Sequence, residues 1–242
     1  MRNIKIIIAY DGTNYYGWQK QKDVLTIQAV IEKKLLKIFQ EKIKLIGSSR
    51  TDAKVHANEQ VANFITNSQI PTLSIKNALN SLLSDDILIK KVEEVSLDFH
   101  ARYKTKTKIY EYKIIKNFSP FYRNYAYFIP YQLNLKKMKK AAKYLIGKHN
   151  FQSFTVTSDS AKNKFCEIKK IIFKENKEFI IFQIEATRFL HKMVRLIMGT
   201  LIKVGKEKIK PEDVKKILIF SDKKLIGAPA PAYGLYLQKI KY

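Results

Sequence analysis

The sequence is poor in cysteine, histidine and acidic residues, and it has no long apolar run. Its single cysteine, Cys166, rules out an intrachain disulfide and a cysteine-based zinc site. The four histidines are scattered and match no zinc spacing such as HExxH. No apolar stretch approaches the roughly 18 residues of a membrane span. The apolar start of the chain is broken by Lys5 and ends at Asp11, which predicts a first strand rather than a signal peptide. We therefore expect a cytoplasmic protein.

The shortage of acidic residues leaves a large positive charge. The chain has 46 Lys and Arg against 21 Asp and Glu, a formal net charge of +25. Such a balance attracts a polyanion, and nucleic acid is the first candidate. Drift toward lysine in an AT-rich genome is an alternative source of part of this excess. With 46% apolar residues over 242 positions, the chain is a folded protein that is long enough for one large or two small domains.

Two comparable cycles of strands and helices predict an α+β fold with helices on one face of a sheet. The first cycle has strands near 5–10, 42–46, 59–65 and 87–95, and helices from 26 and from 74. The second has strands at 109–115, 166–173, 178–185 and the C-terminus, and helices at 135–145, 188–204 and from Pro211. We expect two related α/β-sandwich domains of the ferredoxin or RRM type, 1–104 and 105–242, each with a mixed, mainly antiparallel sheet. The C-terminal strand is assigned to the second domain, 105–242.

The stretch GSSRTDAKVHA, residues 47–57, carries the sharpest chemical signal. Asp52 lies two residues after Arg50, on a turn between two expected strands. The simplest interpretation is a turn or helix-cap aspartate. The functional alternative is that the Arg50 cation favours the ionised carboxylate. Such a carboxylate suits a nucleophile or base at a sugar carbon, where positive charge builds as a glycosidic bond breaks.

Three further stretches have weaker signals. Residues 102–116 carry six cations and three tyrosines, which suit phosphates and unpaired bases or, equally, a solvated strand with core tyrosines. In 187–205 a predicted helix bears a cationic stripe of Arg188, His191, Lys192 and Arg195, as a simple amphipathic helix also would. In YDGTNYYGWQKQ, residues 10–21, the aromatic residues could contact a base, although filling the seam between the domains is favoured.

Read together, these stretches resemble the tRNA pseudouridine synthase A family. The resemblance rests on motifs that occur in the family's order from residue 10 to the C-terminus: YDGTNYYGWQKQ, RTDAKVHA, NSLLSDDI, DFHARYKTKTKIYEY, GKHNF, FLHKMVRLIMGTLIKVG and APAYGLYL. It implies isomerisation of uridine to pseudouridine at positions 38 to 40 of the tRNA anticodon stem-loop. It also implies a homodimer that needs no metal and no cofactor.

The resemblance also implies the roles of individual residues. Asp52 would be catalytic, Arg195 would pair with it, and Tyr110 would lie against the target base. Arg50 would assist base flipping, and Leu235 would line the pocket. Two further residues are expected at the substrate site: Arg102 of the FHAR motif, and His56, which we interpret as structural rather than as a base.

Four positions depart from the family pattern. Ser49 and Lys54 replace the two glycines of GRTDAGVHA, Ser84 stands for a usual proline, and Asn150 for a usual aspartate. If position 54 has a positive φ, Lys54 strains the turn; it could also add a phosphate contact. None of the four removes a catalytic group, so we expect effects on RNA-site preference and stability rather than on activity.

Other functions remain as alternatives. A catalytically silent tRNA-binding protein or RNA chaperone would have no reason to keep Asp52, Tyr110 and Arg195 together. An RNA hydrolase is disfavoured by the unclustered histidines and the missing carboxylate cluster. A ribosome-associated basic protein fits the charge but not the apolar content of two core-forming cycles. The residues leave open whether Asp52 attacks C1′ or removes a 2′ proton.

Overall fold

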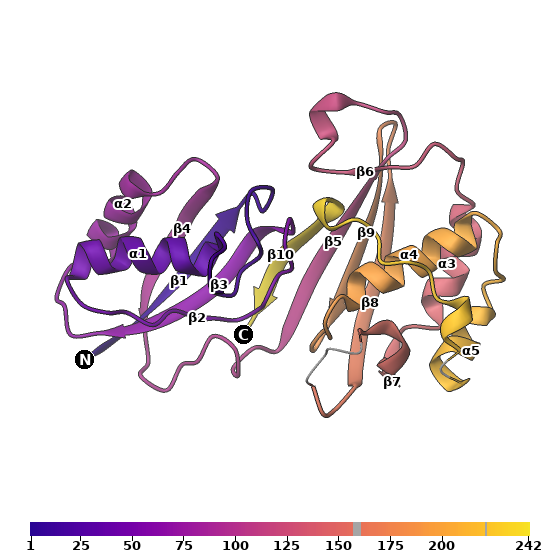
Figure 1. The fold of residues 1–242 in the computed structure, drawn as a ribbon. Coiled ribbons are helices and arrows are strands. Elements are labelled where there is room, and N and C mark those ends of the chain that lie inside the picture. Colours follow the sequence, from indigo (N-terminus) through magenta and orange to yellow (C-terminus); the bar gives the residue numbers. More distant parts are fainter. Residues whose placement is uncertain (157–160, 221) are drawn as a thin grey trace. The chain divides into compact units, whose positions relative to one another are not determined.

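The protein divides into two compact units in a computed structural model, which describes residues 1–156, 161–220 and 222–242. Unit 1 comprises Met1–Lys106 and Tyr236–Tyr242, and unit 2 comprises Thr107–Leu235. Each unit combines strands with helices (Figure 1), so the predicted α+β class is confirmed. Among the described residues, no helix has both the length and the apolar character needed to cross a membrane.

The sheet of unit 1 is built around β1 (Arg2–Tyr10). This strand pairs antiparallel with β3 (His56–Thr66) on one side and with β4 (Ile87–Val95) on the other. On the far edge of β3, the short β2 (Ile46–Gly47) pairs antiparallel and β10 (Leu235–Lys241) pairs parallel. The sheet is therefore mixed and mainly antiparallel, as predicted.

Helices α1 (Ile27–Phe39) and α2 (Thr72–Leu82) cover one face of this sheet (Figure 1). Along β1 the buried side chains alternate with partly exposed ones, as expected when helices cover one face. The buried positions of α1 recur at helical spacing, which gives the helix a continuous apolar stripe: Ile27, Ile31 and Leu35. Each such burial stabilises the fold by about 1.5–3 kcal/mol.

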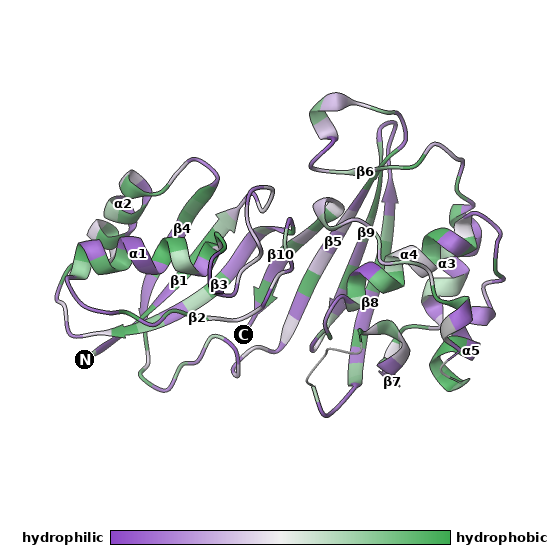
Figure 2. Ribbon diagram, in the orientation of Figure 1, coloured by the Kyte–Doolittle hydropathy of each residue, from purple (hydrophilic) through white to green (hydrophobic). Residues whose placement is uncertain are grey.

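Unit 2 has an antiparallel sheet in the order β5 (Thr107–Ile115), β9 (Phe179–Ala186), β8 (Phe165–Glu175) and β7 (Gly147–Asn150). The short β6 (Tyr127–Phe128) runs parallel to β5. Three helices belong to this unit: α3 (Leu135–Lys143), α4 (Met193–Gly205) and α5 (Asp213–Phe220). Short 3-10 helices lie at Pro120–Tyr122, Gln152–Phe154, Lys223–Leu225 and Ala232–Gly234. Figure 2 shows hydrophobic residues interleaved with hydrophilic ones along the strands of unit 2, and further hydrophobic residues in α4.

Several predicted boundaries differ from the structure. The strand expected near 42–46 is reduced to β2, and α2 begins at Thr72 rather than at residue 74. Thr26 does occupy the N-cap of α1, but its buried hydroxyl has no hydrogen-bond partner among the described residues. The first turn of α1 is therefore fixed by its backbone and by packing, not by a side-chain cap.

The helix predicted from residue 188 is wrong at its start, because α4 begins only at Met193. The preceding residue, Lys192, has a left-handed backbone with φ 59°, which interrupts any helix running through it. Of the four residues in the predicted cationic stripe, Arg195 alone lies within α4. The other three, Arg188, His191 and Lys192, precede the helix and form no helical face.

The grouping of the last strand also differs from the predicted one. The sequence assigns residues 236–242 to a second domain, 105–242, whereas contacts group them with unit 1. The cause is pairing between Tyr236 and His56 and between Leu237 and Ala57, the first residues of β3. Pairing between segments so distant in the chain leaves no local signal in the sequence.

Candidate catalytic site

The turn between β2 and β3 alternates between anchored and outward-facing side chains. Ser49, Thr51 and Val55 are buried, whereas Arg50 is exposed and Asp52 is partly exposed. Ser49 is held through its backbone by Gln60: its N–H donates to Oε1 at 3.3 Å, and its carbonyl accepts from Nε2 at 2.7 Å. The anchored residues thus fix the backbone from which Arg50 and Asp52 project.

The same turn contains a residue with a left-handed backbone at position 54, where the family pattern has glycine. Lys54 has φ 64°, so the positive φ considered for this position is present, and strain in the turn stays a prediction. Its N–H donates to the carbonyl of Tyr15 at 3.1 Å, and the next N–H, of Val55, donates to the Asp52 carbonyl at 3.2 Å. These two bonds hold Lys54 in its conformation and close the turn behind Asp52.

The loop after β1 braces the residue next to Asp52 from three sides. The hydroxyls of Tyr10 and Thr51 lie 2.7 Å apart, and the Trp18 N–H donates to the Thr51 carbonyl at 3.1 Å. Gly17, at φ 87°, approaches so closely that a Cβ there would lie 2.4 Å from the same carbonyl oxygen. This bracing was not predicted, although the YDG and YG pairs in the loop mark tight turns.

The aromatic residues of this loop divide into buried and exposed ones. Trp18 is 1% exposed and fills the space above Gly47, where a Cβ would lie 2.3 Å from the indole nitrogen. Tyr15 is also buried, and its hydroxyl donates to Asp86 at 2.8 Å. Both residues therefore belong to the packing of unit 1. Tyr16 is 60% exposed, so it is the tyrosine of this loop that is available for a base.

His56 is a buried residue at the start of β3. Its Nδ1 accepts the Gly12 N–H at 3.1 Å and also lies 3.0 Å from the Asp11 carboxylate. The Nδ1 atom thus lies between the Gly12 backbone and the Asp11 carboxylate. The ring stacks on Tyr236 at 4.7 Å. These contacts agree with a structural role for His56 in joining the loop, β3 and β10.

Arg102 is exposed on a short turn after a tightly held segment of unit 1. The preceding residue, Ala101, is fully buried: its N–H donates to Asn63 at 2.9 Å and its carbonyl accepts from the Tyr242 hydroxyl at 2.8 Å. The next residue, Tyr103, is 77% exposed. A cation and an aromatic ring thus project together from a fixed backbone, which suits contact with an RNA strand.

Within unit 2, Arg195 is held by the segment that precedes β10. Its Nε donates to the Ala230 carbonyl at 2.7 Å, and its own carbonyl accepts the Ala230 N–H at 3.0 Å. One turn further along α4, a Cβ at Gly199 would lie 1.8 Å from the Ala228 carbonyl oxygen. The segment 227–231, here called the strap, therefore lies directly on α4 and fixes the Arg195 side chain.

Tyr110 and Leu235 are both largely buried in unit 2, at 6% and 5% exposure. The Tyr110 ring meets Phe189 edge-on at 5.1 Å. Two residues along β5, and hence on the same face, Tyr112 donates its hydroxyl to the strap at Pro231, 2.8 Å away. Burial raises the pKa of Tyr112, so this hydroxyl stays protonated and remains a donor. Leu235 follows the strap after the short 3-10 helix Ala232–Gly234.

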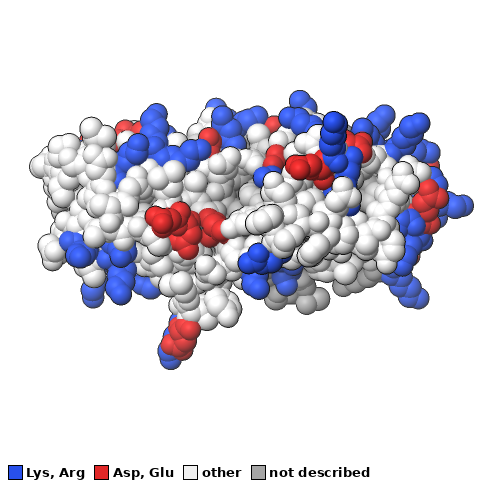
Figure 3. All heavy atoms as spheres, turned by 90° about the horizontal axis from the view of Figure 1, so that it is seen from above, with Lys and Arg blue, Asp and Glu red and all other residues white. Residues whose placement is uncertain are grey.

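The predicted site residues thus form two groups. Arg50, Asp52, His56 and Arg102 belong to unit 1, and Tyr110, Arg195 and Leu235 belong to unit 2. The chain as a whole has a formal net charge of +25, and Figure 3 shows Lys and Arg groups at many points of one face, with Asp and Glu groups among them. Among the described residues, no group of three or more His, Cys, Asp or Glu is placed to hold a metal ion.

Comparison with known proteins identifies the family. The family model for tRNA pseudouridine synthase matches residues 6–104 and 141–242. A tRNA pseudouridine synthase A of Thermoanaerobacter sp. is 47% identical over 100% of both chains, and one of Acetivibrio thermocellus is 45% identical over 100% of both. A tRNA pseudouridine synthase A 2 of Clostridium perfringens is 46% identical, again over the full length of both chains.

Likeness to solved structures is weaker. The crystal structure of the archaeal box H/ACA sRNP Nop10-Cbf5 complex covers 92% of this chain and 59% of that chain, with a TM-score of 0.39 and 10% identity. This similarity is too low to support an argument about function. The full-length relatives and the family model do support one, and they confirm the resemblance seen in the motifs. This chain belongs to the tRNA pseudouridine synthase family.

Proposed function

We propose that this protein isomerises uridine to pseudouridine in tRNA, at positions 38 to 40 of the anticodon stem-loop. One observation carries the proposal: the chain matches proteins named tRNA pseudouridine synthase A over its full length at 45% to 47% identity. The braced turn of Asp52 supports it, because it presents one carboxylate from a backbone held by several hydrogen bonds. Fixed positioning of the reacting group is what such chemistry requires.

The first task of the enzyme is to extract the target base. A stacked uridine must leave the RNA helix, at a cost of a few kcal/mol. We propose that the exposed Arg50 side chain occupies the space that the base vacates and contacts the adjoining phosphate. Tyr110 receives the flipped uracil on its ring, and Leu235 packs against the same base. Because the Tyr110 ring now meets Phe189, binding requires Phe189 to shift or the base to enter beside it.

The chemical step is assigned to Asp52. Its carboxylate either attacks C1′ of the ribose or removes the 2′ proton, and the bond between N1 and C1′ breaks. The uracil rotates and C5 bonds to C1′ while the ester between Asp52 and C1′ breaks or, on the other route, while Asp52 returns the 2′ proton. The C5 proton is then lost to solvent, which gives pseudouridine. Arg195, whose side chain is oriented by the strap, is assigned to pair with the Asp52 carboxylate. Arg102 and the other exposed cations hold the RNA backbone.

The proposal is tested by tritium release. Unmodified tRNA transcripts with 5-tritiated uridine are incubated with the wild-type protein and with Asp52→Asn. Release by the wild type and not by the variant is expected. Asp23→Asn is a matched control that removes a carboxylate from an exposed position of unit 1 where the backbone is already left-handed, and it should keep full activity. Transcripts with cytidine at 38, 39 or 40 identify the reacting position.

Other outcomes distinguish the alternative functions. Tight tRNA binding without tritium release by the wild type would replace the enzyme with a silent tRNA-binding protein. Shorter RNA products would indicate a hydrolase instead. We further propose that the protein acts in the cytoplasm as a homodimer. Light scattering during size-exclusion chromatography should then give twice the 28.3 kDa mass of one chain.

A further inference from the structure

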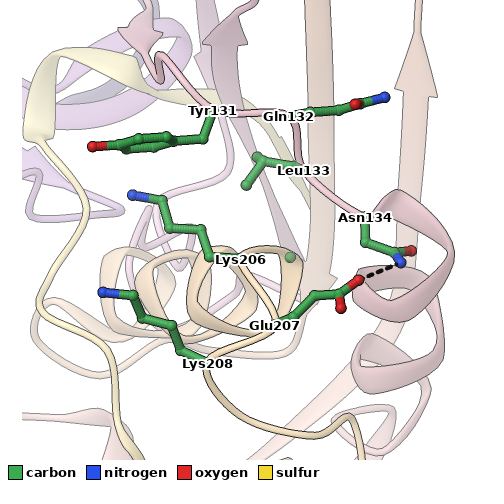
Figure 4. Close-up of a pocket in the computed structure, with 8 residues that line it drawn as sticks. Tyr131, Gln132, Leu133, Asn134, Lys206, Glu207 and Lys208 are labelled. Atoms are coloured by element: carbon green, nitrogen blue, oxygen red, sulfur yellow. Dashed lines mark hydrogen bonds between the residues drawn. The ribbon is translucent and has the colours of Figure 1, made fainter.

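Unit 2 contains an open pocket at the end of α4 that the catalytic residues do not use. Its volume is about 800 Å³, and two short segments line it (Figure 4). Residues 131–134 belong to the segment before α3, and residues 205–208 comprise the last residue of α4 and the three residues after it. Arg195 lies near the beginning of the same helix. At about 1.5 Å of rise per residue, the pocket is about 15 Å further along the helix axis.

The walls of the pocket have a fixed backbone. Glu207, two residues beyond the end of α4, is in the left-handed conformation at φ 58°, and the Lys208 N–H donates back to the Lys203 carbonyl at 3.0 Å. The Asn134 N–H donates to the Gly205 carbonyl at 2.9 Å, which ties one wall to the other. The side chains of residues 206–208 therefore leave a closed helix terminus rather than a loose loop.

The charges in the pocket are separated. The Glu207 carboxylate turns away toward α3, where it accepts from Asn134 Nδ2 at 2.9 Å and lies 3.1 Å from Lys137 Nζ. These two donors lower the pKa of Glu207 and keep its charge on that side. Lys206 and Lys208 both extend in the other direction, toward the side of Tyr131 (Figure 4). Neither lysine has a carboxylate within 4.0 Å among the residues that the structure describes.

Tyr131 completes the pocket with an accessible aromatic ring. The ring is 62% exposed, and Lys206 Nζ lies 4.5 Å from its centroid. Burial does not explain an aromatic residue that is so exposed. Two ammonium groups beside an accessible ring match the two parts of a nucleotide: the phosphate, which attracts cations, and the base, which stacks.

We propose that this pocket binds a nucleotide of the substrate tRNA other than the reacting uridine. Lys206 and Lys208 hold its phosphate, and the base stacks on Tyr131. This inference rests on the proposed function, since it takes the same tRNA as ligand. It means that α4 serves the reaction at both ends: Arg195 near its start is assigned to Asp52, and the pocket beyond its last residue contacts the RNA. The pocket then contributes to affinity and not to the chemical step.

The test measures tRNA binding and steady-state kinetics of the full chain. In Lys206→Gln/Lys208→Gln, KM for an unmodified tRNA transcript should rise about tenfold with kcat unchanged. The slope of log affinity against log salt should fall by about 1.4 to 1.8, as expected for two lost phosphate contacts. Tyr131→Ala should weaken binding about fivefold or more, and Tyr131→Phe should not, because the ring alone stacks.

A second lysine pair distinguishes a specific binding site from a general effect of lost positive charge. Lys139→Gln/Lys143→Gln removes the same charge from two exposed positions of α3 and should change KM less than twofold. Equal effects of the two pairs, or no effect of the pocket pair, would overturn the proposal. So would saturable binding of uridine 5′-monophosphate that the pocket variants abolish while tRNA binding stays intact, because the site would then serve a free nucleotide.

Failure of this inference is distinguishable from failure of the proposed function. If the wild type releases no tritium but the pocket variants still lose tRNA affinity, the pocket is an RNA site on a silent binder. If the wild type is active and the pocket variants bind tRNA normally, the enzyme stands and the pocket proposal falls.

Discussion

The hydroxyl of Tyr10 lies 2.7 Å from the hydroxyl of Thr51, the residue immediately before Asp52. A strand residue of β1 thereby holds the turn that presents the proposed catalytic carboxylate. Thr51 is also held through its carbonyl by the Trp18 N–H. The turn is thus positioned by side chain and backbone together.

Tyr10→Phe tests whether this hydrogen bond positions the carboxylate. One buried hydrogen bond contributes about 1 kcal/mol, so kcat on tRNA should fall about two- to fivefold. KM should stay unchanged, because neither Tyr10 nor Thr51 is assigned to RNA contact. Tyr16→Phe changes an exposed tyrosine of the same loop and should leave both constants unaltered. A rise in KM with kcat intact would show that Tyr10 acts on binding instead.

Lys54→Gly tests the strain in the turn. The left-handed conformation costs a residue with a side chain about 1–2 kcal/mol, and glycine avoids this cost. Glycine's greater freedom in the unfolded chain offsets part of that gain. We expect the free energy of unfolding in urea to rise by about 0.5–1 kcal/mol in Lys54→Gly and not in Lys54→Ala. If Lys54 also contacts a phosphate, both variants will bind tRNA more weakly. Equal stabilities of the two variants would mean that the turn is not strained.

Gly199→Ala tests the contact between α4 and the strap. The added methyl group would lie 1.8 Å from the Ala228 carbonyl oxygen, so the strap must move away from the helix. Overpacking of this kind costs about 1–3 kcal/mol of unfolding free energy. Because Arg195 Nε is bound to Ala230 in the same strap, kcat should fall as well. An active variant of wild-type stability would show that the strap moves without cost and does not position Arg195.

Tyr15 predicts a loss of stability at high pH. Burial, followed by its contact with Asp86, raises the pKa of Tyr15 from 10.0 to about 12. A raised folded-state pKa means that the folded protein holds the proton more tightly than the unfolded chain. This contribution is complete below pH 10 and is lost as the pH rises from about 10 to about 12. Unfolding free energy measured across that range should fall less steeply in Tyr15→Phe. An identical slope in both proteins would contradict the prediction.

The sequence predicted those features that rest on local periodicity or on residue chemistry. The strand Ile87–Val95 and the apolar stripe of α1 were recognisable because their patterns lie within one segment. Asp52 and Arg50 stood out because a carboxylate and a cation on a turn suggest chemistry. The roles of the named site residues stay predictions until the variants are measured.

Features that depend on distant contacts were not predictable. Helix α4 begins late because Lys192 is left-handed, and no propensity of lysine indicates that conformation. The bond between Tyr10 and Thr51 spans 41 residues, and the strap reaches Arg195 across 35. Such contacts are set by packing of the whole unit and leave no pattern in a single sequence.

The parallel pairing of β10 with β3 imposes an order on biosynthesis. Because Tyr236 pairs with His56 at the end of the proposed catalytic turn, the sheet of unit 1 lacks β10 until residues 235–241 have left the ribosome. All of residues 107–235 are translated in between, and they can fold before β10 is available to unit 1. The segment bearing Asp52 is synthesised well before the strand that completes its sheet, so the nascent protein should acquire activity only after residues 235–241 have emerged.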